Sequence, residues 1–198
     1  MSVSAIVLAA GLGTRMVGLK QLLPLDGRPL LQHAVDAAAA AGLDEVIVVL
    51  GHRAGEVASA LALPPGARAV VNPRFAEGQS TSLAAGLAAA SPRSGAALIL
   101  LGDQPAVRPA AIRALADAHR AGGPAILRAA YRGRPGHPVL LDRSVWAEAA
   151  ALRGDQGARS LIAREAGRIG LVEVGGDPPQ GIDTPNDLDR HGGRGRPG

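Results

Sequence analysis

The chain has 198 residues, of which 47% are hydrophobic and 19% charged, so it can form one globular domain with a full core. Its net charge is +4 at pH 7, but the arginines are scattered and only three residues are aromatic, which argues against nucleic-acid binding. The chain has no cysteine for disulfide or thiolate chemistry, and no apolar run reaches the about 20 residues that span a bilayer. We therefore expect a soluble cytoplasmic protein with no nucleic-acid or membrane partner.

Apolar runs typical of buried strands alternate along the chain with Ala- and Leu-rich stretches typical of helices. We expect strands at Ala5–Ala10, Glu45–Leu50, Ala67–Val71, Ala97–Leu101, Ala125–Tyr131, Val139–Leu141 and Gly170–Val174. We expect helices at Pro29–Ala41, Gly55–Leu61, Thr81–Ala90 with Ser80 as its N-cap, Pro109–Arg120, Ser144–Leu152 and Ala158–Glu165. This alternation predicts the α/β class: a single domain over residues 1–190, with a mostly parallel sheet covered on both faces.

Two segments depart from this alternation. The stretch Tyr131–Leu141 holds a Gly/Pro turn between two strands, so we expect a small antiparallel insertion at an edge of the sheet. Residues 191–198 are rich in glycine and arginine, and we expect a disordered tail there.

Polar segments follow three of the predicted strands, at Gly11–Lys20, Asn72–Ser82 and Gly102–Pro105. In an open α/β sheet, ligands bind beyond the carboxyl ends of the strands. We therefore expect these three segments to meet at one rim of the sheet and to form the site.

The loop Gly11–Met16 carries the strongest local signal. It lacks the third glycine of a dinucleotide fingerprint and the Gly-Lys-Ser/Thr ending of a P-loop. Its backbone N–H groups can nevertheless approach phosphates, and Arg15 and Lys20 add two positive charges. Lys20 is the only lysine among 21 basic residues, which indicates a position that needs a compact ammonium group. A merely structural turn is the alternative interpretation.

The stretch Leu8–Lys20 and its continuation to Leu31 resemble the nucleotidyltransferase signature of the molybdenum cofactor guanylyl- and cytidylyltransferases. Within it, Ala9-Ala10-Gly11 is similar to the cytidylyltransferase version. Later segments are similar to the cytidylyltransferase group and follow in its order: Asn72–Gly86, Leu101–Pro105, Gly136–Val139, Gly154–Arg159 and Ile182–Leu188. The chain departs from the family pattern at Gly13, Val17 and Gly181, which bears on the base and the acceptor more than on the reaction type.

This resemblance implies a nucleotide-diphospho-sugar transferase-like, Rossmann-like fold and a Mg²⁺-dependent nucleotidyltransferase. The substrates it implies are a nucleoside triphosphate, CTP first, and the pterin-phosphate acceptor molybdopterin, with pyrophosphate released. A molybdenum hydroxylase is a conceivable client of the product. Sugar phosphates and phospholactate-like molecules remain alternative acceptors.

Two aspartates are the candidate metal ligands. Asp103 directly follows a buried strand and Asp183 lies near the end of the chain. On local grounds Asp103 has a helix cap or turn as its alternative role, and for Asp183 a helix cap is as good an interpretation as a ligand. The family resemblance favours Mg²⁺ at both, and Mg²⁺ takes one or two carboxylates together with phosphates.

We expect Lys20, Arg15 and Asp103 to be catalytic: Lys20 at the α-phosphoryl oxygens, Arg15 at the departing phosphates, and Asp103 at the metal with Asp183. The expected nucleotide-binding residues are Leu8, Ala9, Ala10, Gly11, Gly13, Arg15, Lys20, Gly78, Ser80 and Asp103. The expected acceptor contacts are His137, Asp155 and Arg159, whose structural alternatives are a surface histidine and a capped helix start.

Two rival functions use the same chain differently. An NAD(P)H-dependent reductase would bind a dinucleotide at the glycine loop, but the missing third glycine and the lack of an acidic residue after Glu45–Leu50 count against it. A chaperone that delivers cofactor to a hydroxylase would bind the cofactor without releasing pyrophosphate.

Overall fold

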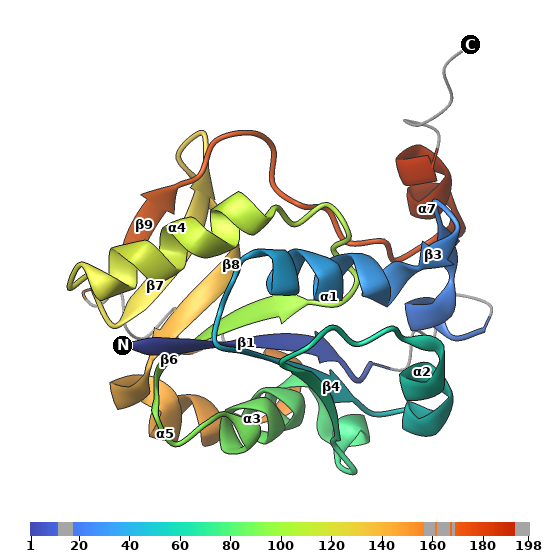
Figure 1. The fold of residues 1–198 in the computed structure, drawn as a ribbon, viewed down its shortest axis with the longest axis horizontal. Helices are drawn as coiled ribbons and strands as arrows, with labels where there is room; N and C mark the ends of the chain where they lie inside the picture. The colour runs from blue at the N-terminus through green and yellow to red at the C-terminus, as the bar shows by residue number, and fades with distance from the viewer. Residues whose placement is uncertain (12–17, 157–160, 162–166, 168, 193–198) are drawn as a thin grey trace.

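The computed structural model describes residues 1–11, 18–156, 161, 167 and 169–192. In this part of the chain, seven strands form one sheet in the order β5-β4-β1-β6-β8-β7-β9 (Figure 1). The strands are β1 (Ser2–Ala9), β4 (Glu45–Leu50), β5 (Ala67–Val71), β6 (Ser94–Leu101), β7 (Ile126–Tyr131), β8 (Arg134–Asp142) and β9 (Ile169–Glu173). All neighbours pair in parallel except β8, which is antiparallel to both β6 and β7. The predicted α/β class and mostly parallel sheet are confirmed.

Helices cover both faces of the sheet. Helices α1 (Leu30–Ala40) and α4 (Pro109–Arg120) lie on one face, and α3 (Gln79–Ala89) and α5 (Trp146–Ala150) lie on the other (Figure 1). The central strands are apolar at nearly every position because both of their faces are buried. None of the helices within the described ranges is long and apolar enough to cross a membrane.

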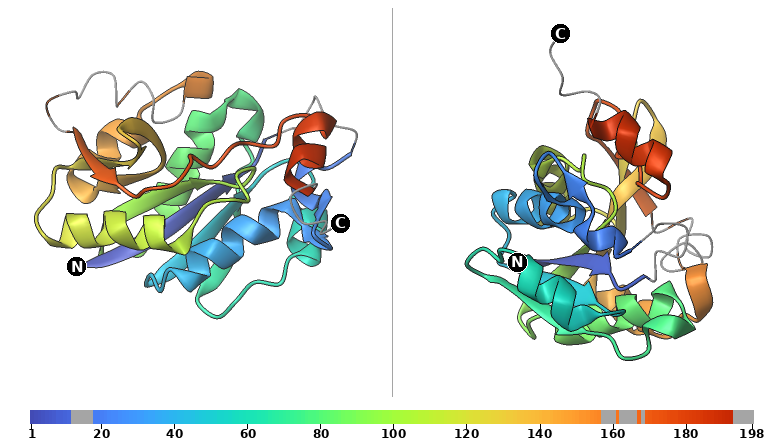
Figure 2. Two further views of the ribbon diagram at one scale, coloured as in Figure 1. Left: turned by 90° about the horizontal axis from the view of Figure 1, so that it is seen from above. Right: turned by 90° about the vertical axis from the view of Figure 1, so that its right-hand side faces the viewer.

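The remaining elements are short. They are the two-stranded hairpin of β2 (Pro24–Leu25) and β3 (Arg28–Pro29), helix α2 (Ala54–Ala60), helix α7 (Pro185–Gly192), and the 3-10 turns η1 (Lys20–Leu22), η2 (Phe75–Glu77), η3 (Arg143–Val145) and η4 (Gly154–Gln156). Figure 2 shows α7 beside the β2–β3 hairpin, where Leu188 packs against Leu25, Leu30 and Ile182.

Helix α3 approaches the sheet closely at Gly86. A Cβ atom on Gly86 would lie 2.4 Å from Cγ2 of Ile6 in β1 and 3.1 Å from Cγ2 of Val49 in β4. The missing side chain therefore lets α3 pack directly onto the central strands. This close packing holds the first residue of the helix, Gln79, near the carboxyl end of β1.

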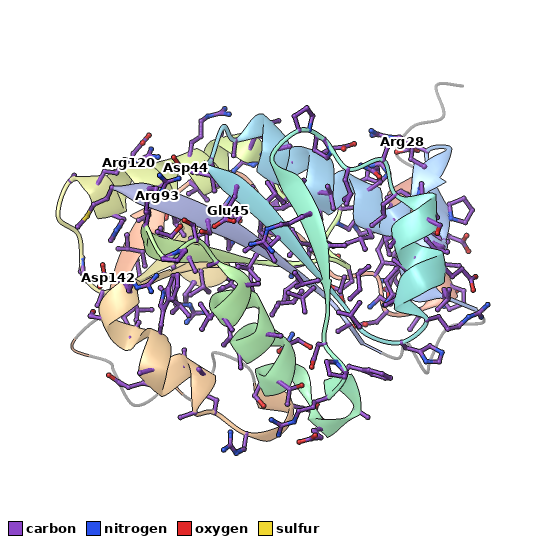
Figure 3. The ribbon with its side chains drawn as sticks, turned by 60° about the horizontal axis from the view of Figure 1, so that its bottom comes forward. Arg28, Asp44, Glu45, Arg93, Arg120 and Asp142 are labelled. Carbon is purple, nitrogen blue, oxygen red and sulfur yellow. The ribbon has the colours of Figure 1, made fainter. Side chains whose placement is uncertain are left out.

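A polar network lies at the amino end of β4, away from the segments that follow the parallel strands. Figure 3 shows Glu45 at this end of the sheet and Arg28 at the opposite end. The carboxylate of Glu45 accepts hydrogen bonds of 2.6 Å from Ser4 Oγ and from Ser91 N–H, and pairs with Arg68 at 3.3 Å. Burial alone would raise the pKa of Glu45, but these bonds and the Arg68 charge outweigh it and lower the pKa below its ordinary value of 4.5.

Three details differ from the sequence-based expectations. The β7–β8 hairpin does not form an edge, because β8 pairs with β6 and β9 adds in parallel outside β7. Ser80 is not the N-cap of α3: the helix starts at Gln79, and Gly78, with φ of 115°, occupies the cap position. Helix α7 was not predicted, and it includes the first two residues of the expected tail, 191 and 192.

Candidate active site

Three charged side chains that are distant in the sequence meet at one point. The Lys20 Nζ atom donates hydrogen bonds to Asp103 Oδ2 at 2.8 Å and to Asp183 Oδ1 at 2.7 Å. The Lys20 side chain is only 11% exposed, whereas those of Asp103 and Asp183 are 33% and 47% exposed. A single ammonium group therefore lies between two carboxylates at the mouth of a cleft.

The loop after β6 places Asp103. The N–H group of Gly102 donates to the carbonyl oxygen of Leu8 at 2.9 Å, which fixes the start of this loop against the end of β1. A Cβ atom on Gly102 would lie 2.8 Å from Cδ1 of Leu31 and 3.0 Å from Cβ of Ala9, so a side chain at this position would force its neighbours to shift. Asp103 therefore projects from the carboxyl edge of the sheet, as predicted from its position after a buried strand.

The segment before α7 places Asp183. Its neighbour Ile182 is fully buried against Leu25 and Leu30, and the Ile182 N–H group donates to the carbonyl oxygen of Asp103 at 3.0 Å. The Thr184 hydroxyl donates a 2.7 Å hydrogen bond to Asp187 Oδ2, which closes the turn into α7. The two aspartates are thus joined through backbone as well as through Lys20.

Gln21 was not among the expected site residues. Its buried side chain donates to the carbonyl oxygens of Ala9 and Gly11, both at 2.9 Å, and so ties η1 to the end of β1. A glutamine directly after the only lysine, inside an otherwise apolar stretch, was the signal that could have identified it.

Two adjoining hollows open at this rim. The first, which we call the main cleft, has a volume of about 260 Å³ and is lined by Leu8, Ala9, Gly11, Lys20, Gln21, Leu30, Gln79, Leu101, Gly102, Asp103 and Asp183. The second, the side hollow, has a volume of about 200 Å³ and is lined by Leu8, Ala10, Gly11, Phe75, Ala76, Gly78, Gln79, Ser82 and Asp155. Leu8, Gly11 and Gln79 line both hollows, so the two hollows are neighbours.

Most expected nucleotide-binding residues line one of these hollows, but some do not. Ser80 lines neither, because it is buried within the first turn of α3. His137 also lines neither; its carbonyl oxygen accepts a 2.6 Å hydrogen bond from Tyr131 Oη. Three expected site residues lie outside the described residues: Gly13, Arg15 and Arg159.

The carboxylates of Asp103 and Asp183 fit a hard divalent cation. Their oxygens converge on the Lys20 ammonium, which shows that a positive charge is accommodated between them. The described residues contain no group of three or more His, Cys, Asp or Glu side chains that could hold a metal by themselves. Water and phosphate oxygens would have to complete the coordination, as is common for Mg²⁺.

The model of the MobA-like NTP transferase domain matches residues 5–169. The chain belongs to this family. Membership confirms the resemblance to molybdenum cofactor nucleotidyltransferases and makes the protein a member of a nucleotidyltransferase enzyme family.

The similarity to individual relatives covers most of the chain. The nicotine blue oxidoreductase of Paenarthrobacter nicotinovorans is 35% identical over 180 residues, which is 86% of each protein. The crystal structure of Rv0371c from Mycobacterium tuberculosis is 35% identical, covers 97% of this chain and 98% of that one, and superposes with a TM-score of 0.87. A second structure of Rv0371c, in complex with manganese, is 34% identical, covers 96% and 98%, and has a TM-score of 0.82.

A nucleotidyl transferase from Methanothermobacter, Mth528, is 30% identical, covers 98% of this chain and 97% of that one, and has a TM-score of 0.80. Together with the sheet order, these similarities confirm the nucleotide-diphospho-sugar transferase-like fold.

Proposed function

We propose that this protein transfers CMP from CTP to the phosphate of molybdopterin and releases pyrophosphate, in the cytoplasm and with Mg²⁺ as cofactor. The observation that carries the proposal is the convergence of Lys20, Asp103 and Asp183 in the main cleft. Mg²⁺ binds to one or two carboxylates together with phosphates, and an ammonium group stabilises charge on a phosphoryl group, so this combination suits a polyanion with its divalent cation.

Asp103 and Asp183 would hold the metal. Rv0371c, which shares 34% of its sequence with this chain, has been solved with manganese, and this supports a divalent-cation site in the present protein. A bound Mg²⁺ would supply charge neutralisation for the phosphate groups.

The protein's own groups bind and align the phosphates. Lys20 is held at the mouth of the cleft, where its ammonium group would stabilise negative charge that develops on the transferred phosphoryl group. The backbone of Gly11 lines both hollows and leaves room for a phosphate to approach. Arg15 would hold the departing phosphates. No general base is required, because the acceptor phosphate is already ionised at neutral pH.

The base and the acceptor would lie on either side of the phosphates. The sequence Ala9-Ala10-Gly11 supports CTP, and Ala10 and Gly78 in the side hollow are suited to contact a base through backbone groups. His137 and Arg159 would contact the acceptor, and a molybdenum hydroxylase would receive the product, with or without direct delivery by this protein.

The test is pyrophosphate release from each of the four nucleoside triphosphates, measured with Mg²⁺ and a set of acceptors that includes molybdopterin, a sugar phosphate and phospholactate. We expect release with CTP and molybdopterin, and a loss of at least about tenfold in Asp103→Asn, which corresponds to 1.4 kcal/mol of barrier. Absence of release from every combination would refute the proposal, whereas release with another acceptor would correct the substrate.

One observation favours a second function. The 35% identity to an oxidoreductase over 86% of each chain supports a reductase on this scaffold. In a dinucleotide-binding fold, an acidic residue after the second strand binds the ribose. In this protein β4 is followed by Gly51 instead of an acidic residue, which counts against dinucleotide binding. A Cβ atom on Gly51 would lie 2.6 Å from the Ala10 carbonyl oxygen and from Phe75 Cβ, so the position is crowded. Oxidation of NAD(P)H with candidate dyes, followed by absorbance, would decide for the reductase, and pyrophosphate release would decide for the transferase.

A further inference from the structure

The turn η4 packs tightly against the start of α3. A Cβ atom on Gly78 would lie 2.5 Å from the carbonyl carbon of Gly154, 2.6 Å from its oxygen and 2.9 Å from Asp155 Oδ1. Gly78 also has φ of 115°, a conformation that a residue with a side chain rarely adopts. Glycine at position 78 therefore allows η4 to lie against this loop and brings the Asp155 carboxylate to the wall of the side hollow.

Among the described residues that line the side hollow, Asp155 is the one with a charged side chain. The other walls are apolar or backbone, except for Gln79 and Ser82, and the Ser82 hydroxyl already accepts a hydrogen bond of 3.0 Å from Asn72. No hydrogen bond or ion pair joins the Asp155 carboxylate to another described residue. Within the described residues, its oxygens are therefore able to accept a hydrogen bond from a ligand.

The charges that line the two hollows are opposite in sign and suit different ends of a nucleotide. Lys20 attracts phosphate to the main cleft, whereas the negative Asp155 disfavours phosphate in the side hollow. An ionised carboxylate only accepts hydrogen bonds, so a ligand group beside Asp155 must donate one.

We propose that Asp155 accepts a hydrogen bond from the exocyclic amino group of the nucleotide base and thereby selects cytosine over uracil. The inference rests on the proposed nucleotidyl transfer and assigns Asp155 to the base in place of the acceptor contact expected from the sequence. Aspartate and glutamate read cytosine through this amino group in other complexes. Uracil presents a carbonyl oxygen at the same position, and two acceptors facing each other repel.

The experiment measures the dissociation constants of CTP and UTP by calorimetry with Mg²⁺ for the wild type, Asp155→Ala and Asp155→Asn. We expect the wild type to prefer CTP. Asp155→Ala should reduce this preference at least about fivefold by weakening CTP, because one such contact contributes about 1–3 kcal/mol. Asp155→Asn should strengthen UTP, because its amide can turn and donate to the uracil oxygen.

Glu77→Gln is the matched control. This substitution also removes one negative charge, next to Gly78. The wild-type Glu77 pairs with Arg74 at 2.7 Å and does not line the side hollow. The substitution should leave the ratio of the two dissociation constants unchanged. An equal change in Glu77→Gln would show a general charge effect and overturn the proposal.

Two further outcomes separate this proposal from the proposed function. If the wild type binds CTP but neither Asp155 variant changes the CTP/UTP ratio, the base-reading role is wrong and nucleotidyl transfer stands; a raised acceptor KM would then return Asp155 to the acceptor. If the wild type binds no nucleoside triphosphate, both proposals fail.

Discussion

Replacing Lys20 with methionine separates two roles of its ammonium group. In the free protein this group lies 2.8 Å from Asp103 and 2.7 Å from Asp183, in the space that a divalent cation would share. Methionine keeps the apolar stem but removes the positive charge of Lys20 from between the two carboxylates. We therefore expect Lys20→Met to bind a divalent cation more tightly than the wild type when no nucleotide is present.

The burial of the three side chains sets the size of this effect. Exposed ion pairs contribute about 0–1 kcal/mol, and removal of one partner from a buried pair costs about 3–5 kcal/mol. Lys20 is 11% exposed but its partners are 33% and 47% exposed, so the free energy of its two ion pairs lies between these limits. An intermediate value of about 1.4 kcal/mol corresponds to about a tenfold decrease in the dissociation constant for the cation.

The assay is titration of the nucleotide-free protein with Mn²⁺, in which the paramagnetic resonance signal of free Mn²⁺ measures binding. Lys20→Arg is the control that keeps the charge. It should leave Mn²⁺ binding weak but lower turnover at least about tenfold, since the forked guanidinium cannot replace a compact ammonium. Unchanged or weaker Mn²⁺ binding in Lys20→Met would refute the idea that the ammonium and the cation compete. Wild-type turnover in Lys20→Arg would remove the need for lysine.

Five other variants test the site and the fold. Asp103→Asn and Asp183→Asn should each raise the Mn²⁺ dissociation constant in the same titration, and an unchanged value would remove that residue from the metal site. Gly86→Ala should lower the free energy of unfolding in urea by about 1–3 kcal/mol, because its Cβ has no room. Gly55→Ala, a helical position with nothing within 4 Å of the added Cβ, should stabilise by about 0.4–1 kcal/mol. Because folding lowers the pKa of Glu45, its contribution to stability is present above pH 4.5 and is lost as the pH falls below it. Glu45→Gln should therefore lose less stability than the wild type between pH 7 and about pH 3, and equal losses would contradict this reasoning.

Periodicity and apolar runs were sufficient to predict the strands of the central sheet and the helices beside it. The strand Glu45–Leu50 and the helix Pro109–Arg120 were predicted with the bounds that the structure shows. A strand buried on both faces must be apolar at every position, and this signal is local. The place of β8 between β6 and β7 could not be predicted in the same way, because it depends on the pairing of β8 with β6, a strand distant in the sequence. Helix α7 carries few apolar residues and is anchored through Leu188, which only the folded chain reveals.

The sequence by itself determined the kinds of chemical group available: one lysine, one aspartate after a buried strand and another near the end of the chain, and a glycine loop with room for phosphate. These follow from residue type and local order. Only the tertiary structure decided that the Lys20 ammonium lies between Asp103 and Asp183, and that Asp155 stands beside Gly78. The two Lys20 contacts join residues 83 and 163 positions apart, so they depend on which strand ends share an edge and how closely helices pack onto the sheet. Neither is encoded in any single stretch of the chain.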